Sequence, residues 1–236
     1  MSGLKLSALY ALYPHRLGLC GPQKGKKILY NYLLGKEKNT KKLKEILKEF
    51  HAFYNYYCLI AQYNNIQDPF DERVVEAYWV GNKLLKRVPT EGIKKMILQK
   101  FTGPDLLSLQ EVKKRIQKIP QGAKPHHSFH VFILGAISGR IVLKGKLIDI
   151  CRIGWAKVKK IRRKKILADY QEIKKFKNRF VLCSSKEKEF FWDKNLASEI
   201  KIGDWVSLHW ENVVEVLSPR KKKNLENYTK LTLSLL

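Results

Sequence analysis

The spacing of apolar residues changes near residue 120, and this change limits the possible folds more than any other feature of the chain. Between Thr40 and Gln62, apolar side chains recur every three or four residues, as one face of an amphipathic helix requires. They are Leu43, Ile46, Leu47, Phe50, Phe53, Tyr54 and Tyr57. The pattern predicts one helix over this range, with Thr40 as its N-cap.

Two further helices are predicted before the change. Asp68 is the expected N-cap of the first, with Pro69 at its first position, and its helical spacing continues to Pro89. Capping also accounts for the acidic cluster that begins at Asp68 without any catalytic role. The second helix is expected from about Asp105 to Ile119, where Pro120 stops it. Residues 1 to about 120 are therefore predicted to be mostly helical.

Short runs rich in Ile and Val, separated by glycines, follow this helical part. The predicted strands are Arg140–Leu143, Lys146–Ile150, Trp155–Val158, Arg179–Cys183, Phe190–Trp192 and Asp204–Trp210. Several short strands at this spacing are typical of a small β-barrel. A terminal helix is expected over Leu225–Leu236. The fold class is α+β: a mainly helical domain, 1–140, followed by a small OB/SH3-like β-barrel domain with a C-terminal helix, 141–236.

The chain is strongly basic, because 47 Lys and Arg face 21 Asp and Glu, a formal net charge of +26. A lysine-favouring amino-acid usage explains this charge as well as contact with a polyanion does. The densest basic run is a candidate nucleic-acid surface on an exposed hairpin. Its cations are Lys157, Lys159, Lys160, Arg162, Arg163, Lys164 and Lys165.

The four cysteines, Cys20, Cys58, Cys151 and Cys183, are too widely spaced for a disulfide framework or a zinc knuckle. We therefore expect reduced thiols and a cytoplasmic protein. The apolar run Val131–Ile137 is far shorter than the ~20 residues that span a bilayer, so no membrane segment is expected. No small-residue cleavage signature follows the apolar N-terminus, which argues against a signal peptide.

Two segments of the predicted barrel carry a resemblance to a known family. They are Asp149-Ile-Cys-Arg-Ile-Gly-Trp-Ala-Lys-Val158 and Lys201-Ile-Gly-Asp-Trp-Val-Ser-Leu-His-Trp-Glu-Asn-Val-Val214. Together they resemble the small β-barrel metallochaperones of nickel-iron hydrogenase maturation, the HypC/HupF family. The resemblance covers roughly the last 90 residues. It implies that Cys151 matches the family cysteine and His209 the family histidine, which together hold iron. In that family the cysteine directly follows the initiator Met, whereas Cys151 is internal.

Other candidate ligands are weaker. His126 and His130 share one face on a helix or on a strand, so the pair can contact a metal; hydrogen bonding to the backbone at a domain junction is the alternative. Cys20 lies in a turn between Gly18 and Gly21, and a buried structural thiol is its alternative. The same alternative applies to Cys151.

The sequence thus predicts an accessory, metallochaperone-like protein rather than an enzyme, because no set of nucleophile, base and orienting group can be placed. Its expected cofactor is transiently bound iron, and its expected partner is a metalloenzyme precursor or a maturation scaffold. Nucleic-acid binding by the basic run is the alternative function. The whole chain also resembles an uncharacterised prokaryotic family encoded near nickel-iron hydrogenases. That resemblance rests on Leu19–Pro22, Asp68–Arg73 and His127–Phe132.

Overall fold

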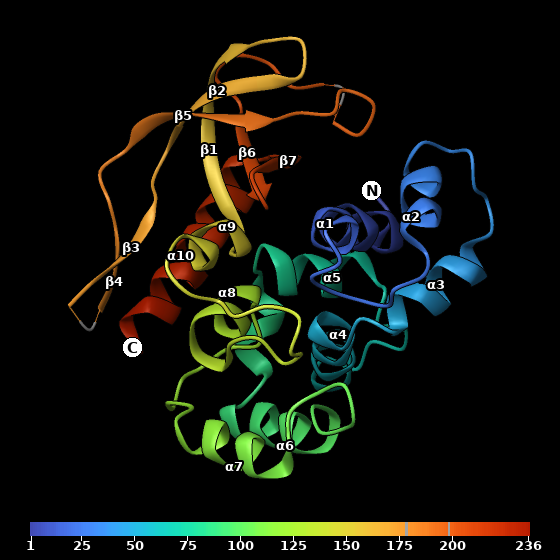
Figure 1. Cartoon of the computed structure of the whole chain (residues 1–236), viewed down its shortest axis with the longest axis vertical. Coiled ribbons are helices and arrows are strands. Elements are labelled where there is room, and N and C mark those ends of the chain that lie inside the picture. Colours follow the sequence, from blue (N-terminus) through green and yellow to red (C-terminus); the bar gives the residue numbers. More distant parts are fainter. Residues whose placement is uncertain (178, 198) are drawn as a thin grey trace.

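A computed structural model describes residues 1–177, 179–197 and 199–236. Helices form the first part of the chain and gather at one end of the molecule, while the strands gather at the other (Figure 1). The helices before the strands are α1 (Gly3–Arg16), α2 (Lys26–Leu33), α3 (Thr40–Lys48), α4 (His51–Tyr63), α5 (Glu72–Trp79), η1 (Lys83–Arg87), α6 (Thr90–Lys100), α7 (Leu109–Gln117), α8 (His127–Phe129), the π-helical turn η2 (His130–Leu134) and α9 (Lys146–Cys151).

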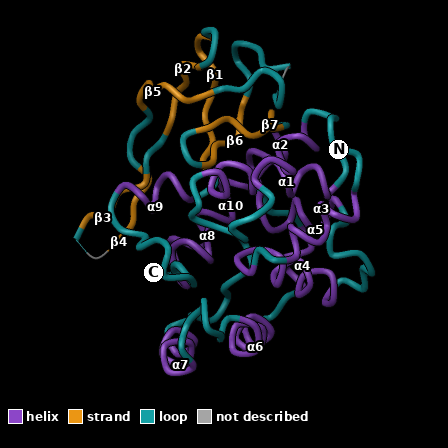
Figure 2. Tube along the Cα trace, turned by 45° about the vertical axis from the view of Figure 1, so that its right-hand side comes forward, coloured by secondary structure: helices purple, strands orange, loops and turns teal. Residues whose placement is uncertain are grey.

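Five strands close into a barrel in the order β1-β2-β5-β7-β6. Their bounds are β1 (Gly154–Ile161), β2 (Lys165–Tyr170), β5 (Lys186–Phe191), β6 (Trp205–His209) and β7 (Asn212–Leu217). All neighbours are antiparallel except β5 and β7, which pair in parallel and close the ring. β3 (Ile173–Phe176) and β4 (Arg179–Leu182) form a separate two-stranded ribbon that extends away from the barrel (Figure 2). The α+β fold predicted from the sequence is confirmed.

The last helix, α10 (Pro219–Ser234), connects the barrel to the helical part. It runs from β7 toward α8, and its Leu225 is fully buried. Leu225 belongs to the same apolar cluster as Trp155 and Leu217 of the barrel. Tyr10 and Trp79 of the helical part belong to this cluster too, and their two rings stack on each other. The largest apolar core therefore crosses the predicted boundary at residue 140.

The helix predicted over Thr40–Gln62 is two helices. Asn39, not Thr40, is the N-cap of α3, since its side chain accepts a hydrogen bond from the backbone N–H of Lys42 at 2.9 Å. The chain then turns at Phe50, which is fully buried and packs against Phe53. Burying this ring redirects the chain, so that α4 begins at His51 in a new direction although the apolar spacing continues.

The expected start of the next helix is displaced in the same way. Asp68 accepts a hydrogen bond from the backbone N–H of Phe70 and stabilises a turn, whereas Asp71 is the N-cap of α5. The helix ends at Trp79, and a 3-10 turn rather than an α-helix leads to Pro89. The helix before Pro120 is shorter than predicted and begins after Ser108, which caps it.

Two predicted strands are wrong. Arg140–Leu143 is irregular, and Lys146–Ile150 lies in the short helix α9. The physical reason is a buried polar pair at the end of α9: Asp149 and Arg152 are three residues apart, and one helical turn brings them together. The terminal helix begins earlier than predicted, at Pro219, because Ser218 caps it.

In the part of the chain that the structure describes, no helix is both long and apolar enough to cross a membrane.

Candidate metal centre

Three segments far apart in the sequence meet at one point between the helical part and the barrel. His127 is the first residue of α8, Cys151 the last of α9 and His209 the last of β6. Their ligand atoms all lie within 4.8 Å of one another. A backbone hydrogen bond from Trp210 to the carbonyl of Ile150, 2.8 Å long, joins the end of β6 to the end of α9. This bond keeps Cys151 next to His209.

The ring of His209 is oriented by a carbonyl from another element. Its Nδ1 lies 2.8 Å from the backbone oxygen of Tyr10 in α1, and because a carbonyl only accepts, Nδ1 carries the proton. Nε2 therefore keeps its lone pair, and this buried atom has no hydrogen-bond partner among the described residues. Burial lowers the pKa of His209 to about 4, so the ring is neutral at pH 7. A neutral imidazole with a free Nε2 is suited to bind a metal.

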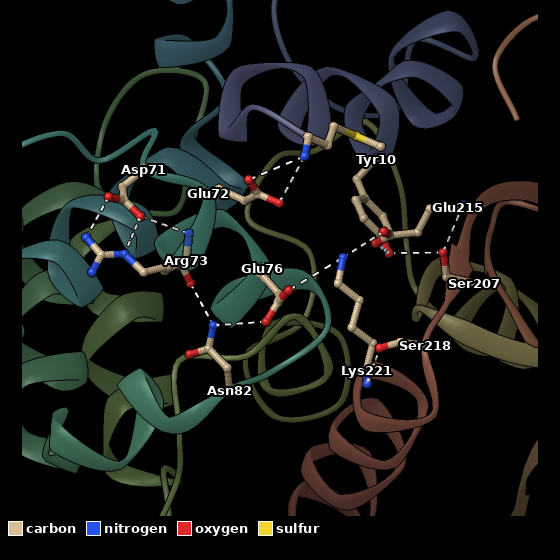
Figure 3. Close-up of polar contacts among 11 residues, drawn as sticks. Tyr10, Asp71, Glu72, Arg73, Glu76, Asn82, Ser207, Glu215, Ser218 and Lys221 are labelled. Atoms are coloured by element: carbon tan, nitrogen blue, oxygen red, sulfur yellow. Dashed lines mark hydrogen bonds and ion pairs between the residues drawn. The ribbon is translucent and has the colours of Figure 1, made fainter.

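Tyr10 is itself fixed by a buried polar network, shown in Figure 3. Its hydroxyl donates to Glu215 at 2.8 Å and lies 3.0 Å from the Ser207 hydroxyl. Lys221 of α10 lies between Glu215, at 2.9 Å, and Glu76 of α5, at 3.5 Å. Contacts of this kind around a metal ligand fix its orientation.

Cys151 is held by the structure on either side of it. The preceding Asp149 and the following Arg152 form a buried ion pair of 3.1 Å. The same Asp149 oxygen accepts hydrogen bonds from the Tyr170 hydroxyl, at 3.0 Å, and the backbone N–H of Ile173, at 2.8 Å. Burial raises the pKa of the Cys151 thiol well above its usual range, so without a metal it stays protonated at neutral pH.

His127 has contacts at both ring nitrogens. Nδ1 lies 3.1 Å from the Tyr78 hydroxyl and Nε2 lies 3.0 Å from the Cys151 carbonyl, while Tyr78 donates to the Ala52 carbonyl at 2.6 Å. Burial holds the pKa of His127 well below its usual value, so the ring carries one proton. These three contacts need three donated protons, whereas the ring and the Tyr78 hydroxyl supply only one proton each. One His127 nitrogen therefore keeps a lone pair, and a metal bound at that atom would replace the contact that the atom makes now.

The three residues line a pocket of about 480 Å³. Trp79, His130 and Trp210 also line it, and the exposed side chains of Lys24 and Arg140 lie at its edge. The group therefore faces a space that reaches the protein surface.

The structure separates the other predicted ligands. His126 caps α8, where its Nδ1 accepts from the backbone N–H of Ser128, and its ring stacks on Tyr228 of α10. His130 lines the pocket, with its Nδ1 3.3 Å from the Tyr56 hydroxyl, and burial lowers its pKa to about 4. His126 and His130 thus contact different helices and lie outside the three-residue group.

Cys20 lines the same pocket as Cys151 and His130 but lies outside the group. Burial raises the pKa of its thiol to about 11, and the nearby Arg140 offsets part of this effect. Cys20 is thus a thiol of the pocket wall.

His127 is the site residue that sequence reasoning missed. The equal-parity spacing of His126 and His130 drew attention to those two, but α8 begins only at His127 and turns this ring toward β6. The run of neighbouring histidines indicated that this segment belongs to a site, but it did not indicate which of the rings faces the barrel.

The basic run forms the hairpin of β1 and β2, as predicted. Three of its cations have acidic partners: Lys159 with Asp169 at 3.4 Å, and both Arg162 and Lys165 with Glu189. The other four have no ion-pair partner in the described ranges. They are Lys157, Lys160, Arg163 and Lys164, and all four are exposed.

Comparisons with known proteins place the chain in a family. A family model with the description "Family of unknown function (DUF6390)" matches residues 1–236, and the chain belongs to that family. No curated protein and no solved structure matches the chain. The expected membership of an uncharacterised family is confirmed, whereas no named relative links the chain to the HypC/HupF family.

Proposed function

We propose that this member of the DUF6390 family is an accessory protein that holds a transition metal at Cys151, His209 and His127. The expected metal is iron, and the expected role is to assist assembly of a metal centre of the nickel-iron hydrogenase type in another protein. One observation carries the proposal: three soft or borderline ligands from separate elements meet within 4.8 Å, and one of them has a buried nitrogen with no partner.

The chemistry of the ligands fits such a metal. Thiolate and imidazole ligands suit iron, zinc and copper better than magnesium or calcium. The buried Cys151 thiol must lose its proton when a metal binds, and the metal supplies the positive charge that stabilises the thiolate. Metal affinity is therefore expected to fall as the pH is lowered.

Three protein ligands also suit a metal that is bound and then released. Metal sites with three protein ligands keep a position open for another molecule, whereas structural sites with four are closed. An open position gives a client protein or scaffold access to the metal. The resemblance of the segments around Cys151 and His209 to HypC/HupF supports the choice of client.

The test is the metal content of protein purified without oxygen, measured by elemental analysis. Wild type is expected to carry about one equivalent of iron, as a single three-ligand site allows. Cys151→Ala and His209→Ala are expected to lose it. Cys183→Ser and His51→Gln are the matched controls, because they remove a thiol and an exposed imidazole outside the group. Wild type without metal, or metal kept in both site variants, would overturn the proposal.

The exposed hairpin favours a second candidate function, binding of nucleic acid. Lys157, Lys160, Arg163 and Lys164 are free of acidic partners in the part of the chain described, so they can contact phosphates. If they do, the logarithm of the binding constant for duplex RNA or DNA falls linearly with the logarithm of salt concentration, and replacing the four by Gln makes the slope shallower. An unchanged slope in that variant would exclude the hairpin.

A further inference from the structure

His127, Cys151 and His209 are called the metal group below. The pocket beside them is much larger than a metal ion needs. Its volume is about 480 Å³, within the range of about 300 to 1,000 Å³ typical of pockets for small organic molecules. His127, Cys151 and His209 occupy only one part of its wall. Metal binding does not account for the rest of the pocket, which has room for a further ligand.

Most of that remaining wall is apolar. It includes two phenylalanines at the start of α4 and aliphatic side chains from the loops before α7 and after η2. They are Phe50, Phe53, Leu106, Ile137, Ile141 and Leu143. A ligand with an apolar body can bury that body here, which is a main source of affinity in such pockets.

Trp210, one of the lining residues, carries an unused hydrogen-bond donor. The indole N–H of Trp210 is buried and has no acceptor among the described residues, although buried donors nearly always have one. Trp210 and Glu211 form the two-residue loop between β6 and β7, with φ values of 52° and 60°. This left-handed backbone favours Asn and Gly and is unfavourable for a bulky residue such as Trp. Backbone strain of this kind is concentrated at functional sites.

One cation at the edge of the pocket, Arg140, is free to pair with an anion. Arg140 lines the edge of the pocket and donates to the Gly21 carbonyl, but it forms no ion pair with any carboxylate in the described ranges. Its charge favours the thiolate of Cys20, and no carboxylate acts on the pKa of that thiol. The lining carboxylate of Glu49 is already paired with Lys24 at 3.1 Å, and the other lining carboxylate is that of Asp105. An anion is therefore favoured at the Arg140 side.

We propose that this pocket binds a small organic carboxylate with an apolar body. Arg140 pairs with the carboxylate, the apolar wall covers the body, and the Trp210 N–H donates to an acceptor atom of the ligand. Arg140, Trp210 and the apolar wall lie outside the metal group, so this site and the proposed function can fail separately.

The test is calorimetric titration of the full-length protein with straight-chain carboxylates from butanoate to decanoate and with 3-phenylpropanoate. The uncharged control ligand is 3-phenylpropanamide, which has the same apolar body. At least one carboxylate is expected to bind about tenfold or more tightly than the amide, because hydrogen bonds to charged groups are the strong ones. Arg140→Gln is expected to remove this preference, and Lys144→Gln, at an exposed position nearby, is expected to keep it.

The same samples are analysed for metal and titrated again after treatment with a chelator. Carboxylate binding that survives removal of the metal supports the pocket independently of the metal. No binding by any member of the series, equal binding of the amide, or a preference unchanged in Arg140→Gln would overturn this inference. Wild-type protein that contains metal but shows no preference for carboxylates would defeat the pocket alone. Wild-type protein that binds carboxylates but contains no metal would defeat only the proposed function.

Discussion

Single residues decide whether the candidate metal centre can work. The free nitrogen of His209 depends on the carbonyl of Tyr10, and Tyr10 is held by Glu215 and Ser207. The ligand thus depends on contacts that join α1 to β6 and β7. A change in these contacts is expected to affect both stability and metal affinity.

Tyr10→Phe keeps the carbonyl that His209 needs but removes the hydroxyl. It leaves Glu215 and Ser207 buried with one hydrogen bond fewer, at an expected cost of about 1 to 3 kcal/mol in the free energy of unfolding. Because the hydroxyl positions Tyr10 and does not touch His209, metal affinity is expected to weaken by less than the about 10- to 100-fold that follows loss of a ligand's direct partner. Urea unfolding and metal titration measure both effects. Tyr32→Phe, at a half-buried residue, is the control. Equal behaviour of the two variants would contradict the role of Tyr10.

The buried histidines predict how stability depends on pH. Burial lowers the pKa of His209 and His130 to about 4 and that of His126 to about 3. The unfolded chain, with a histidine pKa near 6.5, therefore binds more protons below that pH than the folded chain. Their stabilising contribution is complete above about pH 6.5 and is lost as the pH falls toward 4, by about 1.4 kcal/mol per pH unit and histidine.

Unfolding in urea at pH 7, 6 and 5 measures this dependence, in a range above the usual pKa of carboxyl groups. His130→Gln is expected to reduce the slope of the free energy of unfolding against pH by the amount that corresponds to one proton, about 1.4 kcal/mol per pH unit. Stability that does not change between pH 7 and pH 5 would show that the rings are not buried as neutral groups.

At the scale of elements, the sequence predicts the kinds of element better than their ends. The α+β order follows from apolar spacing, which is a local property. The break at Phe50 and the helix at Lys146–Cys151 depend instead on what each segment packs against. In Lys146–Ile150 the apolar residues fit a strand as well as a helix, and the pairing of Asp149 with Arg152 favours the helix.

The candidate site, too, could be predicted only as far as local sequence determines it. A resemblance in sequence singled out Cys151 and His209, which the structure places together. His127 and the pocket could not be predicted, because α8, α9 and β6 meet only through long-range packing. His126 and His130 share a face in a regular element, but the chain passes from a cap into a π-helical turn between them.

The helix α9 provides a prediction at this scale. Asp149→Asn leaves the Arg152 guanidinium buried without its counter-charge and is expected to cost about 3 to 5 kcal/mol. The double variant Asp149→Asn/Arg152→Met is expected to cost less than the sum of the two single changes, since the pair is coupled. Asp169→Asn, whose partner Lys159 is exposed, is the control and is expected to cost less than about 1 kcal/mol. Additive effects in urea unfolding would contradict coupling of the pair.

At the scale of the whole molecule, the apolar core unites the two parts. Tyr10, Trp79, Trp155 and Leu225 belong to one cluster, and the metal group lies where α8, α9 and β6 meet. The predicted boundary at residue 140 therefore cuts through the largest apolar cluster, while a second cluster lies within the barrel. The site exists only when both parts are folded and docked.

A single cooperative unfolding transition is expected as a result. Four of the five tryptophans lie in the barrel part, so tryptophan fluorescence reports mainly on the barrel, while far-ultraviolet circular dichroism reports mainly on the helices. The two signals should give the same midpoint in urea. Two separate midpoints would mean that the parts unfold independently.

Titration with Co²⁺, followed by electronic absorption under anaerobic conditions, tests the central claim most directly, because it identifies the ligands as well as the binding. The metal group predicts one equivalent of Co²⁺ with a thiolate-to-metal charge-transfer band, and visible bands of a four-coordinate ion if one exchangeable ligand joins the three residues. The charge-transfer band should vanish in Cys151→Ser and remain in Cys183→Ser, and His209→Gln should weaken binding. A band that persists in Cys151→Ser, or Co²⁺ bound without any thiolate band, would contradict the metal centre described above.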